Sequence, residues 1–293
     1  MKSISQILAD QLQTVEPGAN FTGSPPRLVS SSGKQYFAKG GRPEEAEQYA
    51  GEAESLKHIA KAAPGLAPSV VASGSDDNIP YMITEYKNLR PLNDASAKRL
   101  GERLAKELHI YKGLNGFGFE IPTYCGATRL QNGWFESWEE CYSALIGDLL
   151  SQLSKKGGYN SLCAKGEKVR KDVIPALLGP LVVQPVLLHG DLWSGNMGTE
   201  TSSGEPIIFD PASYYGHNEA DLAIARIFGG VPKVFFETYH RHLPKTEPAE
   251  QYELRSDLYQ LFHYLNHTLL FGGHYAASAD AKMDILLKAV PRL

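Results

Sequence analysis

Three polar side chains suited to phosphoryl transfer lie close together in the sequence. Asp191 and Asn196 are five residues apart in the segment HGDLWSGN, residues 189–196, and Asp210 follows fourteen residues later. Transfer of a γ-phosphoryl group needs a carboxylate near the acceptor hydroxyl and oxygen ligands that hold Mg²⁺ on the phosphates. Kinase catalytic loops have an Asp and an Asn at this same step of five, followed by a second metal-binding Asp after a nearby strand. The three residues therefore predict a phosphoryl-transfer site.

Asp, Asn and Gly are also common in turns for local reasons, so each of these residues alone could be a turn residue without chemistry. The surrounding sequence favours the catalytic interpretation. Short apolar runs at 185–188 and 206–209, flanked by Gly, Pro and Ser, predict two strands whose ends come together. That arrangement would present all three side chains to one cleft.

The composition indicates an enzyme of one large or two moderate domains. The chain has 293 residues and a formal net charge of -4, with both signs mixed along it. The absence of a basic tract argues against nucleic acid as a partner and suits a cationic small ligand. No segment approaches the roughly 20 apolar residues of a membrane span, and the N-terminal residues lack an apolar stretch of signal-peptide length. We therefore expect no membrane association and a cytoplasmic location, with the cysteines Cys125, Cys141 and Cys163 reduced and buried.

A lysine and an acidic helix in the first third of the chain fit a nucleotide site. Residues 35–39 predict a strand that ends on Lys39, and residues 43–62 predict a helix with glutamates near its positive end. In kinases a strand lysine contacts the α and β phosphates and is held by a glutamate of the next helix. Glu52 or Glu54 could face Lys39 in this way. The alternative is an exposed lysine beside a solvated acidic helix.

The remaining pattern predicts a small strand-rich lobe followed by a larger helical lobe. The expected elements are a helix at 3–14, strands at 67–74 and 79–86, and helices at 95–112, 137–156, 167–178, 221–226 and 254–271. The break after Tyr86 predicts a nucleotide-binding lobe at 1–86 and a catalytic and substrate-binding lobe at 87–293. His109 on the helix at 95–112 is expected to be packed or hydrogen-bonded, because no partner histidine lies nearby to complete a metal site.

The sequence resembles the fructosamine kinase family, also called fructosamine-3-kinases or ketosamine-3-kinases, over nearly its whole length. The segments that carry the resemblance are FAK at 37–39, GEAESL at 51–56, FGF at 117–119, YCG at 124–126, HGDLWSGN at 189–196, DPA at 210–212, YGHNEADLA at 215–223, FGG at 228–230 and LNH at 265–267. Trp193 is a useful discriminator, because aminoglycoside and choline kinases share the Asp and Asn but usually not the whole octapeptide. The resemblance implies an α+β, bilobal protein-kinase-like fold of the aminoglycoside phosphotransferase type.

The resemblance also implies roles for matching residues. It makes Asp191 the proton acceptor, Asn196 and Asp210 the Mg²⁺ ligands, Lys39 the phosphate contact of ATP and Glu52 the ion-pair partner of Lys39. Adenine would lie against the hinge residues, largely through their backbone groups; these residues are Glu85, Tyr86 and Lys87.

The candidate substrate contacts are less specific. Trp193 could stack on the apolar face of a sugar or be a buried core residue, and Glu219 could attract a cationic amine. His267 lies with His263 and Asn266 on the polar face of the helix at 254–271, where the three could line a pocket or meet solvent. Asp221 is expected to brace the catalytic loop without touching substrate.

Such enzymes use ATP to phosphorylate the sugar 3-hydroxyl of ketosamines, notably on glycated lysine, and the 3-phosphate then decomposes and releases the free amine. The resemblance therefore implies a deglycation kinase whose partners are ketosamine small molecules or glycated proteins, and it leaves the oligomeric state open. Two alternatives remain. One is a kinase for another hydroxylated amine, such as an aminoglycoside or choline-like compound, and the other is a catalytically silent nucleotide-binding scaffold.

The N-terminal loop departs from the family pattern. Many members have a redox-sensitive cysteine in this glycine-rich loop, whereas residues 18–26 contain none. Regulation by an intermolecular disulfide is therefore not expected. The loop is also poorer in glycine and contains Pro25-Pro26, which leaves its phosphate contacts open.

Overall fold

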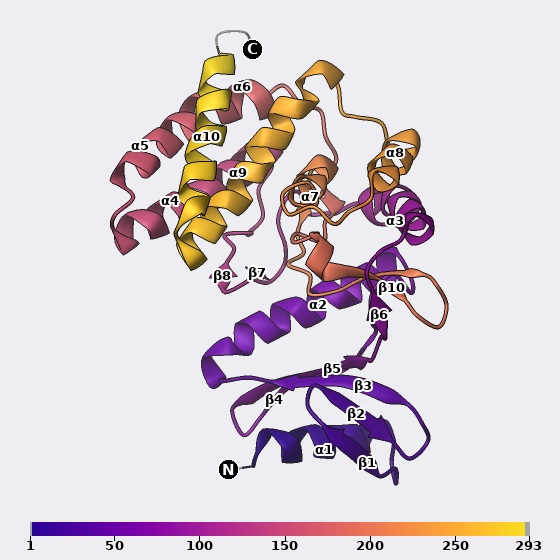
Figure 1. Cartoon of the computed structure of the whole chain (residues 1–293). Coiled ribbons are helices and arrows are strands. Elements are labelled where there is room, and N and C mark those ends of the chain that lie inside the picture. The colour runs from indigo at the N-terminus through magenta and orange to yellow at the C-terminus, as the bar shows by residue number, and fades with distance from the viewer. Residues whose placement is uncertain (1, 291–293) are drawn as a thin grey trace.

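The computed structural model describes residues 2–290, and it has a small lobe and a large lobe joined by a narrow waist (Figure 1). The small lobe contains an antiparallel five-stranded sheet in the order β1-β2-β3-β5-β4. Its strands are β1 (Phe21–Ser24), β2 (Arg27–Ser30), β3 (Gln35–Gly40), β4 (Val70–Asp76) and β5 (Ile79–Glu85). The register places Lys39 of β3 opposite Met82 of β5, close to the waist.

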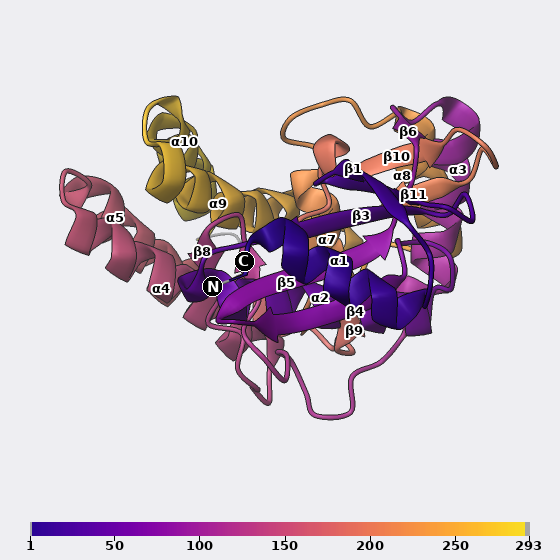
Figure 2. The same ribbon diagram turned by 90° about the horizontal axis from the view of Figure 1, so that it is seen from below.

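The two helices of the small lobe cover opposite faces of this sheet, because successive side chains of a strand point to opposite sides. Helix α1 (Ile4–Val15) begins at a capping box formed by Ser3 and Gln6 and packs Ile7, Leu8 and Leu12 on one face, against Ile83 of β5. Figure 2 shows α1 lying across this outer face. Helix α2 (Ala46–Ala62) packs on the other face, where Leu56 and Ile59 share a core with Met82.

Helix α2 also packs directly on the large lobe. A Cβ atom at Gly51 would lie 2.4 Å from the carbonyl oxygen of Pro122, so only glycine permits this approach. One turn later, Ser55 Oγ accepts a hydrogen bond of 3.2 Å from the backbone N–H of Ser213, three residues after Asp210. The position of α2 is therefore coupled to the Asp210 segment.

The chain crosses between the lobes at residues 86–88. Strand β6 (Leu89–Arg90) already belongs to the large lobe, where it pairs with β10 (Met197–Glu200), which in turn pairs with β11 (Pro206–Ile208). The chain therefore passes between the lobes just after Tyr86. We propose residues 1–86 and 87–293 as the two domains. No helix in residues 2–290 is both long enough and apolar enough to cross a membrane.

The large lobe is mainly helical. Helices α4 (Trp138–Lys156) and α9 (Tyr252–Phe271) pack around an aromatic core. In this core Trp138 Nε1 donates to Tyr259 Oη at 2.9 Å and Tyr142 Oη donates to the Leu258 carbonyl at 2.6 Å. Two small antiparallel pairs, β7 (Tyr124–Cys125) with β8 (Thr128–Arg129) and β9 (Val186–Leu187) with β12 (Tyr215–Gly216), lie near the waist. The helices are α3 (Asp94–Lys106), α4 (Trp138–Lys156), α5 (Asn160–Lys168), α6 (Ile174–Leu178), α7 (Asn218–Ile224), α8 (Lys233–His242), α9 (Tyr252–Phe271) and α10 (His274–Ala289).

Several predicted elements differ from the structure in their limits. The helix expected at 95–112 ends at Lys106, because Glu107 leaves helical geometry (φ -120°, ψ -66°) and a 3₁₀ turn follows at Leu108–Ile110. The helix expected at 167–178 is the end of a longer run that starts at Asn160 and includes a π-helical turn at Val169–Val173. The predicted strands at 185–188 and 206–209 exist as the shorter β9 (Val186–Leu187) and β11 (Pro206–Ile208), which pair with β12 and β10. Helices α8 and α10 were not predicted.

Candidate active site

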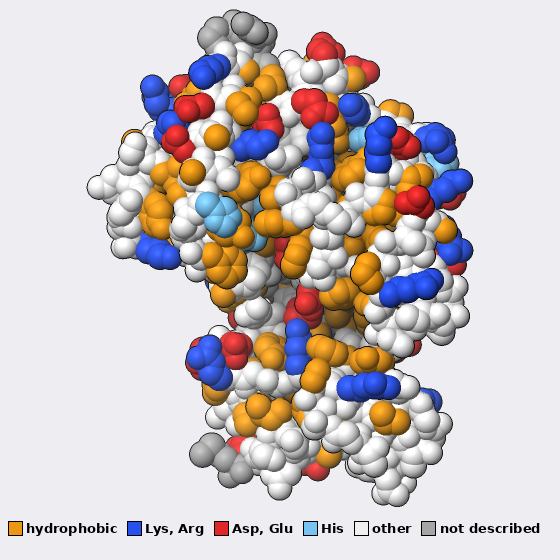
Figure 3. Space-filling view, in the orientation of Figure 1, with side chains coloured by type: hydrophobic (Ala, Val, Ile, Leu, Met, Phe, Trp, Pro, Cys, Tyr) orange, Lys and Arg blue, Asp and Glu red, His pale blue; other side chains and the backbone are white. Residues whose placement is uncertain are grey.

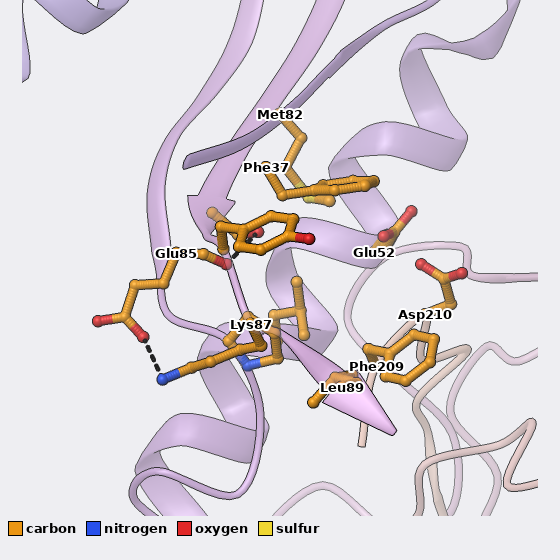
Figure 4. A pocket seen from close by; sticks show the side chains of 12 residues that line it. Phe37, Glu52, Met82, Glu85, Lys87, Leu89, Phe209 and Asp210 are labelled. Atoms are coloured by element: carbon orange, nitrogen blue, oxygen red, sulfur yellow. Dashed lines mark hydrogen bonds and ion pairs between the residues drawn. The ribbon is translucent and has the colours of Figure 1, made fainter. Parts of the chain in front are cut away.

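Two adjoining pockets occupy the cleft between the lobes, which appears as a hollow at the waist in Figure 3. The first is mostly apolar and reaches the hinge (Figure 4); it is lined by Phe37, Leu56, Pro68, Met82, Thr84, Glu85, Tyr86, Lys87, Leu89 and Phe209. The second is polar and is lined by Lys39, Gln48, Tyr124, Gly126, Asp191, Trp193, Asn196 and Pro211. Glu52 and Asp210 line both pockets. The two pockets could therefore hold one ligand with a flat apolar part in the first pocket and a charged part in the second, joined near these two carboxylates.

His189, in the loop that follows β9, holds the backbone of Asp191 in place. The backbone N–H of Asp191 donates to His189 Nδ1 at 3.2 Å, and His189 Nε2 lies 2.9 Å from the carbonyl oxygen of Phe209. These contacts fix the tautomer with the proton on Nε2. Burial lowers the pKa of His189, which keeps the ring neutral. His189 thus joins the Asp191 loop to the segment that carries Asp210.

Asp221 of α7 holds the same loop from beneath. Its carboxylate accepts hydrogen bonds from the backbone N–H groups of His189 (2.7 Å) and Gly190 (2.8 Å), and from His109 Nε2 (3.1 Å). Burial alone would raise the pKa of Asp221, but these donors hold it below its usual value. His109 is accordingly buried and hydrogen-bonded, as predicted, and its Nδ1 lies 2.7 Å from Tyr239 Oη. A Cβ atom at Gly190, where φ is +85°, would lie 2.1 Å from the Ala212 carbonyl oxygen, so this loop requires glycine.

Asp191 and Asn196 are in direct contact. Asn196 Nδ2 donates to the Asp191 carbonyl at 2.9 Å and to Asp191 Oδ2 at 3.1 Å. Several effects together raise the pKa of Asp191 to about 7: burial is the largest, the nearby Asp221 and Asp210 add to it, and the Asn196 hydrogen bond opposes it. A carboxylate with a pKa near neutrality is well matched to accept a proton from an alcohol as the alcohol reacts.

Asp210 follows β11 and is held in a left-handed conformation, with φ +52°. The neighbouring backbone is fixed on both sides, by a hydrogen bond from Phe209 N–H to the Asn196 carbonyl (3.0 Å) and from Ala212 N–H to the His189 carbonyl (2.8 Å). A non-glycine residue held at positive φ is a sign of a functional constraint. Here the constraint keeps the Asp210 carboxylate exposed in the cleft beside Asn196.

Lys39 of β3 pairs with Glu52 of α2, at 2.6 Å and 2.9 Å from Nζ to the two carboxylate oxygens. Glu54, the other candidate, faces away and pairs with Lys57 and His58. Burial lowers the pKa of Lys39, but Glu52 outweighs this effect and the net shift is upward, so the ammonium group stays charged. For Glu52, burial and Asp210 together raise the pKa to about 7 despite Lys39. Two carboxylates thus lie close enough to repel each other.

The oxygen ligands present fit Mg²⁺. Mg²⁺ prefers carboxylate and carbonyl oxygens together with phosphate oxygens and water. Both amide hydrogen bonds of Asn196 are made by Nδ2, which leaves Oδ1 to bind a cation, and the Asp210 carboxylate is open to the cleft. A cation here would also relieve the repulsion between Glu52 and Asp210.

The hinge residues 85–87 line the apolar pocket and differ in the hydrogen bonding of their backbone N–H groups. Glu85 N–H donates to the Ser69 carbonyl (3.0 Å) and Tyr86 N–H to the Gln35 carbonyl (3.1 Å), whereas Lys87 N–H has no hydrogen-bond partner within residues 2–290. The side chains of Glu85 and Lys87 pair with each other at 3.3 Å (Figure 4). The guanidinium carbon of Arg27 lies over the Tyr86 ring, 4.7 Å from the ring centroid.

Trp193, Phe228 and His267 form a row of aromatic rings, of which Trp193 lines the polar pocket together with Asp191. Trp193 is 36% exposed and lines the polar pocket, so it is not a core residue. Its ring meets Phe228 edge to face at 5.6 Å, and Phe228 meets His267 at 5.1 Å. Phe228 was not singled out from the sequence, although its segment carries part of the family resemblance. Gln48 and Tyr124 also line the pocket, and sequence periodicity offered no signal for them.

The prediction that Glu219 attracts a substrate amine is wrong in this structure. Glu219 is 2% exposed, and its carboxylate receives two hydrogen bonds from the fully buried Arg255, at 2.7 Å and 3.0 Å. The backbone N–H of Thr246 donates a third bond at 2.8 Å. Its charge is therefore already neutralised inside the large lobe, away from the cleft residues.

The fold and this cleft define a protein-kinase-like phosphotransferase. The aminoglycoside phosphotransferase APH(4)-Ia, solved with AMP-PNP and hygromycin B, superposes with a TM-score of 0.65 at 15% identity, covering 98% of this chain and 99% of that one. A Thermobifida fusca structure assigned as a fructosamine-3-kinase superposes more closely, with a TM-score of 0.77 at 27% identity over 93% and 94% of the two chains. The predicted fold class is therefore confirmed.

The sequence comparisons agree with this class and narrow it. The family model for fructosamine kinase matches residues 11–289. The mouse ketosamine-3-kinase is 36% identical over 277 residues, which cover 85% of this chain and 87% of the mouse protein. The chloroplastic protein-ribulosamine 3-kinase of rice, Oryza sativa subsp. japonica, is 40% identical over 192 residues, 64% of this chain and 54% of the rice protein. The chain belongs to the fructosamine kinase family.

Proposed function

We propose that this protein is an ATP-dependent kinase that phosphorylates the sugar 3-hydroxyl of ketosamines. One observation carries the proposal: Asp191, Asn196, Asp210 and the Lys39–Glu52 pair line one cleft, with an exposed tryptophan beside the aspartate, in a chain of the fructosamine kinase family. The mouse and rice relatives, a ketosamine-3-kinase and a protein-ribulosamine 3-kinase, support the same substrate class.

In this proposal, adenine occupies the apolar pocket against Glu85, Tyr86 and Lys87, and Lys39 contacts the phosphates while Glu52 holds it in place. Asp191 orients the 3-hydroxyl and accepts its proton as the oxygen attacks the γ-phosphorus. The bond from phosphorus to the ADP oxygen breaks at the same time, and ADP leaves. Asn196 and Asp210 would hold Mg²⁺, which neutralises phosphate charge when bound. Positioning and charge neutralisation supply most of the rate enhancement.

Trp193 and His267 would contact the acceptor. The exposed face of Trp193 fits the apolar face of a sugar, and the neutral His267 ring, whose pKa is lowered by burial, belongs to the same row of aromatic rings. Phosphate is a better leaving group than hydroxide, so it is eliminated from C3 of the ketosamine 3-phosphate, and water then hydrolyses the imine that remains and frees the amine. The physiological result would be deglycation of small amines or proteins.

The cellular setting is also a proposal. Cys125 and Cys141 are buried and Cys163 is partly buried, and all three are free thiols. Free thiols suit a reducing compartment such as the cytoplasm. The chloroplastic relative shows that another compartment is represented among similar proteins.

A kinase for a different hydroxylated amine is the second candidate, because APH(4)-Ia shares the fold. A substrate panel separates the two. MgATP consumption would be measured with ribulosyl-lysine and fructosyl-lysine, and in parallel with aminoglycosides and choline. Turnover on a ketosamine alone supports the proposal, and turnover only on the other amines overturns it. Absence of MgATP-dependent turnover on every compound would instead favour a silent nucleotide-binding protein.

A further inference from the structure

A second cluster of potential metal ligands includes Asp191 and lies within the large lobe. Cys125 of β7, Asp191 and His263 of α9 each offer one ligand atom, and the three atoms all lie within 4.8 Å of one another. The residues come from segments far apart in sequence, so the fold itself creates the cluster. The candidate Mg²⁺ ligands Asn196 and Asp210 do not belong to this cluster. Asn196 adjoins it through the hydrogen bond to Asp191 Oδ2.

One ring nitrogen of the histidine in this cluster is buried without a hydrogen-bond partner among residues 2–290. His263 is 5% exposed, and its Nδ1 atom makes no hydrogen bond with any residue from 2 to 290. Buried polar atoms are almost always hydrogen-bonded, and an exception calls for an explanation such as an unseen ion. Burial lowers the pKa of His263 to about 3, so the ring is neutral, which is the form that binds metals.

The cysteine is equally well placed and held rigidly. Cys125 is 2% exposed. Its carbonyl accepts a hydrogen bond of 3.1 Å from Asn266 Nδ2, and Thr128 Oγ1 donates to Asn266 Oδ1 at 2.5 Å. Asn266 lies one helical turn after His263, so these bonds fix the β7–β8 hairpin against the part of α9 that carries the histidine. Burial and the adjacent Asp191 raise the pKa of the Cys125 thiol, which argues against a reactive thiolate in the metal-free protein.

We propose that Cys125, Asp191 and His263 form an inhibitory binding site for Zn²⁺. One sulfur, one imidazole nitrogen and one carboxylate oxygen are the ligand types that Zn²⁺ takes, whereas Mg²⁺ requires oxygen ligands. Three protein ligands would leave the fourth position of the ion to water, and the ion would enter through the polar pocket, which Asp191 lines. Binding replaces the thiol proton, which passes to solvent, and it forms the zinc–sulfur bond.

Zinc at this site would stop phosphoryl transfer, because the Asp191 carboxylate cannot both bind the ion and accept the proton of the acceptor. This inhibition rests on the proposed role of Asp191, whereas the metal binding does not. The experiment therefore needs a readout of each.

Direct binding is tested with Co²⁺, a spectroscopic substitute for Zn²⁺, added to the purified full-length protein. Wild type should show thiolate-to-cobalt charge-transfer absorption, and Cys125→Ser should lose it. The matched controls Cys141→Ser and Cys163→Ser, which remove the other two thiols, should retain it. A wild-type protein without the band, or a band that persists in Cys125→Ser, would overturn the site. If Cys125→Ser does not fold, wild type and His263→Gln carry this test, and an unchanged spectrum in His263→Gln overturns the site.

Inhibition is tested at buffered free Zn²⁺ with saturating MgATP, and each variant is compared with its own metal-free rate. Cys125→Ser and His263→Gln should each raise the inhibition constant about tenfold or more, since even the loss of an outer partner costs about 10–100-fold in metal affinity. Equal inhibition of wild type and both variants, relieved by excess Mg²⁺, would mean that zinc acts at the magnesium ligands, and it would overturn the proposal. If ketosamines are not turned over at all, the proposed function fails while the cobalt spectrum still decides the metal site.

Discussion

Asp191 is placed where its environment, and not its residue type alone, sets its chemistry. An exposed aspartate has a pKa near 4, far from the value that favours proton acceptance at neutral pH. Burial beside Asp221 and Asp210 raises the pKa of Asp191 to about 7. The same burial makes the ionised form costly, so rate and stability should respond to this residue in opposite directions.

The first prediction concerns rate. Asp191→Asn should lower kcat by about 10²–10⁴-fold, the range associated with loss of a general base. In wild type, kcat/KM should fall as pH drops through about 7, because protonated Asp191 cannot accept a proton. Initial rates at constant free Mg²⁺ between pH 5 and 9 measure both effects. A profile that stays flat down to pH 5 would contradict this role for Asp191.

The second prediction concerns stability. A carboxyl group whose pKa rises on folding binds its proton more tightly in the folded state, so its contribution is complete below the unfolded pKa and is lost as pH rises through about 7. Asp191→Asn removes the charge, and at pH 8 it should raise Tm by roughly 2–4 °C, the shift expected for about 1 kcal/mol. The gain should shrink toward pH 4.

Asp172→Asn is the matched control, because Asp172 is exposed on the large lobe. Its thermal midpoint should follow wild type at both pH values. A lower Tm for Asp191→Asn at pH 8 would show that the ionised carboxylate stabilises the fold, contrary to this account.

The sequence predicted the placement of those candidate residues that belong to local motifs. Asp191, Asn196 and Asp210 come to one pocket because short segments with fixed backbone contacts carry them. The choice between Glu52 and Glu54 could not be made, because it depends on which face of α2 meets the sheet. The proximity of Cys125 and His263 could not be predicted from the sequence, because only the packing of β7 against α9 brings them together.

At the scale of elements, helix α7 connects the loop of Asp191 to helix α9 through its two acidic residues. Asp221 binds the backbone of the loop that carries Asp191, and Glu219 binds Arg255 of α9. The role predicted for Glu219 was wrong because its partner lies 36 residues away, and helical periodicity carries no information on such a pair. The helix predicted at 95–112 was too long for a related reason: apolar spacing continued beyond the point where the backbone turned.

The third prediction tests the corrected role of Glu219. Glu219→Ala leaves the Arg255 guanidinium buried and unpaired, which should lower the free energy of unfolding by about 3–5 kcal/mol. The KM of the folded fraction for a ketosamine should not change. Denaturant unfolding and steady-state kinetics measure the two quantities. Glu237→Ala, which breaks an exposed pair with Lys233, is the control and should cost at most about 1 kcal/mol. A raised KM with intact stability would restore the substrate role.

At the scale of the whole molecule, two lobes form one site. Lys39 and Glu52 belong to the small lobe and Asp191, Asn196 and Asp210 to the large one. Helix α2, which carries Glu52, approaches the large lobe closely at Gly51 and is hydrogen-bonded to it at Ser55. The two-lobe arrangement was predictable from the change from strand-rich to helix-rich sequence. The docking of α8 and α10 was not, because their sequences gave no pattern that was recognised as helical.

The fourth prediction follows from this shared site. We expect MgATP to bind only the folded protein and therefore to raise Tm with concentration, by the equivalent of about 2.7 kcal/mol at 100 times Kd. Lys39→Met should weaken this shift and raise the KM for ATP, because the phosphate contact is lost while the apolar pocket remains. Lys57→Met, on the exposed side of α2, should behave as wild type. Equal losses in both variants would argue against a specific contact of Lys39.

The most direct test of the central claim is to identify the product. Purified protein would be incubated with MgATP and ribulosyl-lysine or fructosyl-lysine, and phosphorus NMR and mass spectrometry would follow the sugar phosphate and the free lysine. We predict a 3-phosphate that appears first, lysine that is released as the phosphate decays, and both products formed far more slowly with Asp191→Asn. Phosphorylation at another hydroxyl, or a 3-phosphate formed equally by wild type and Asp191→Asn, would contradict this account.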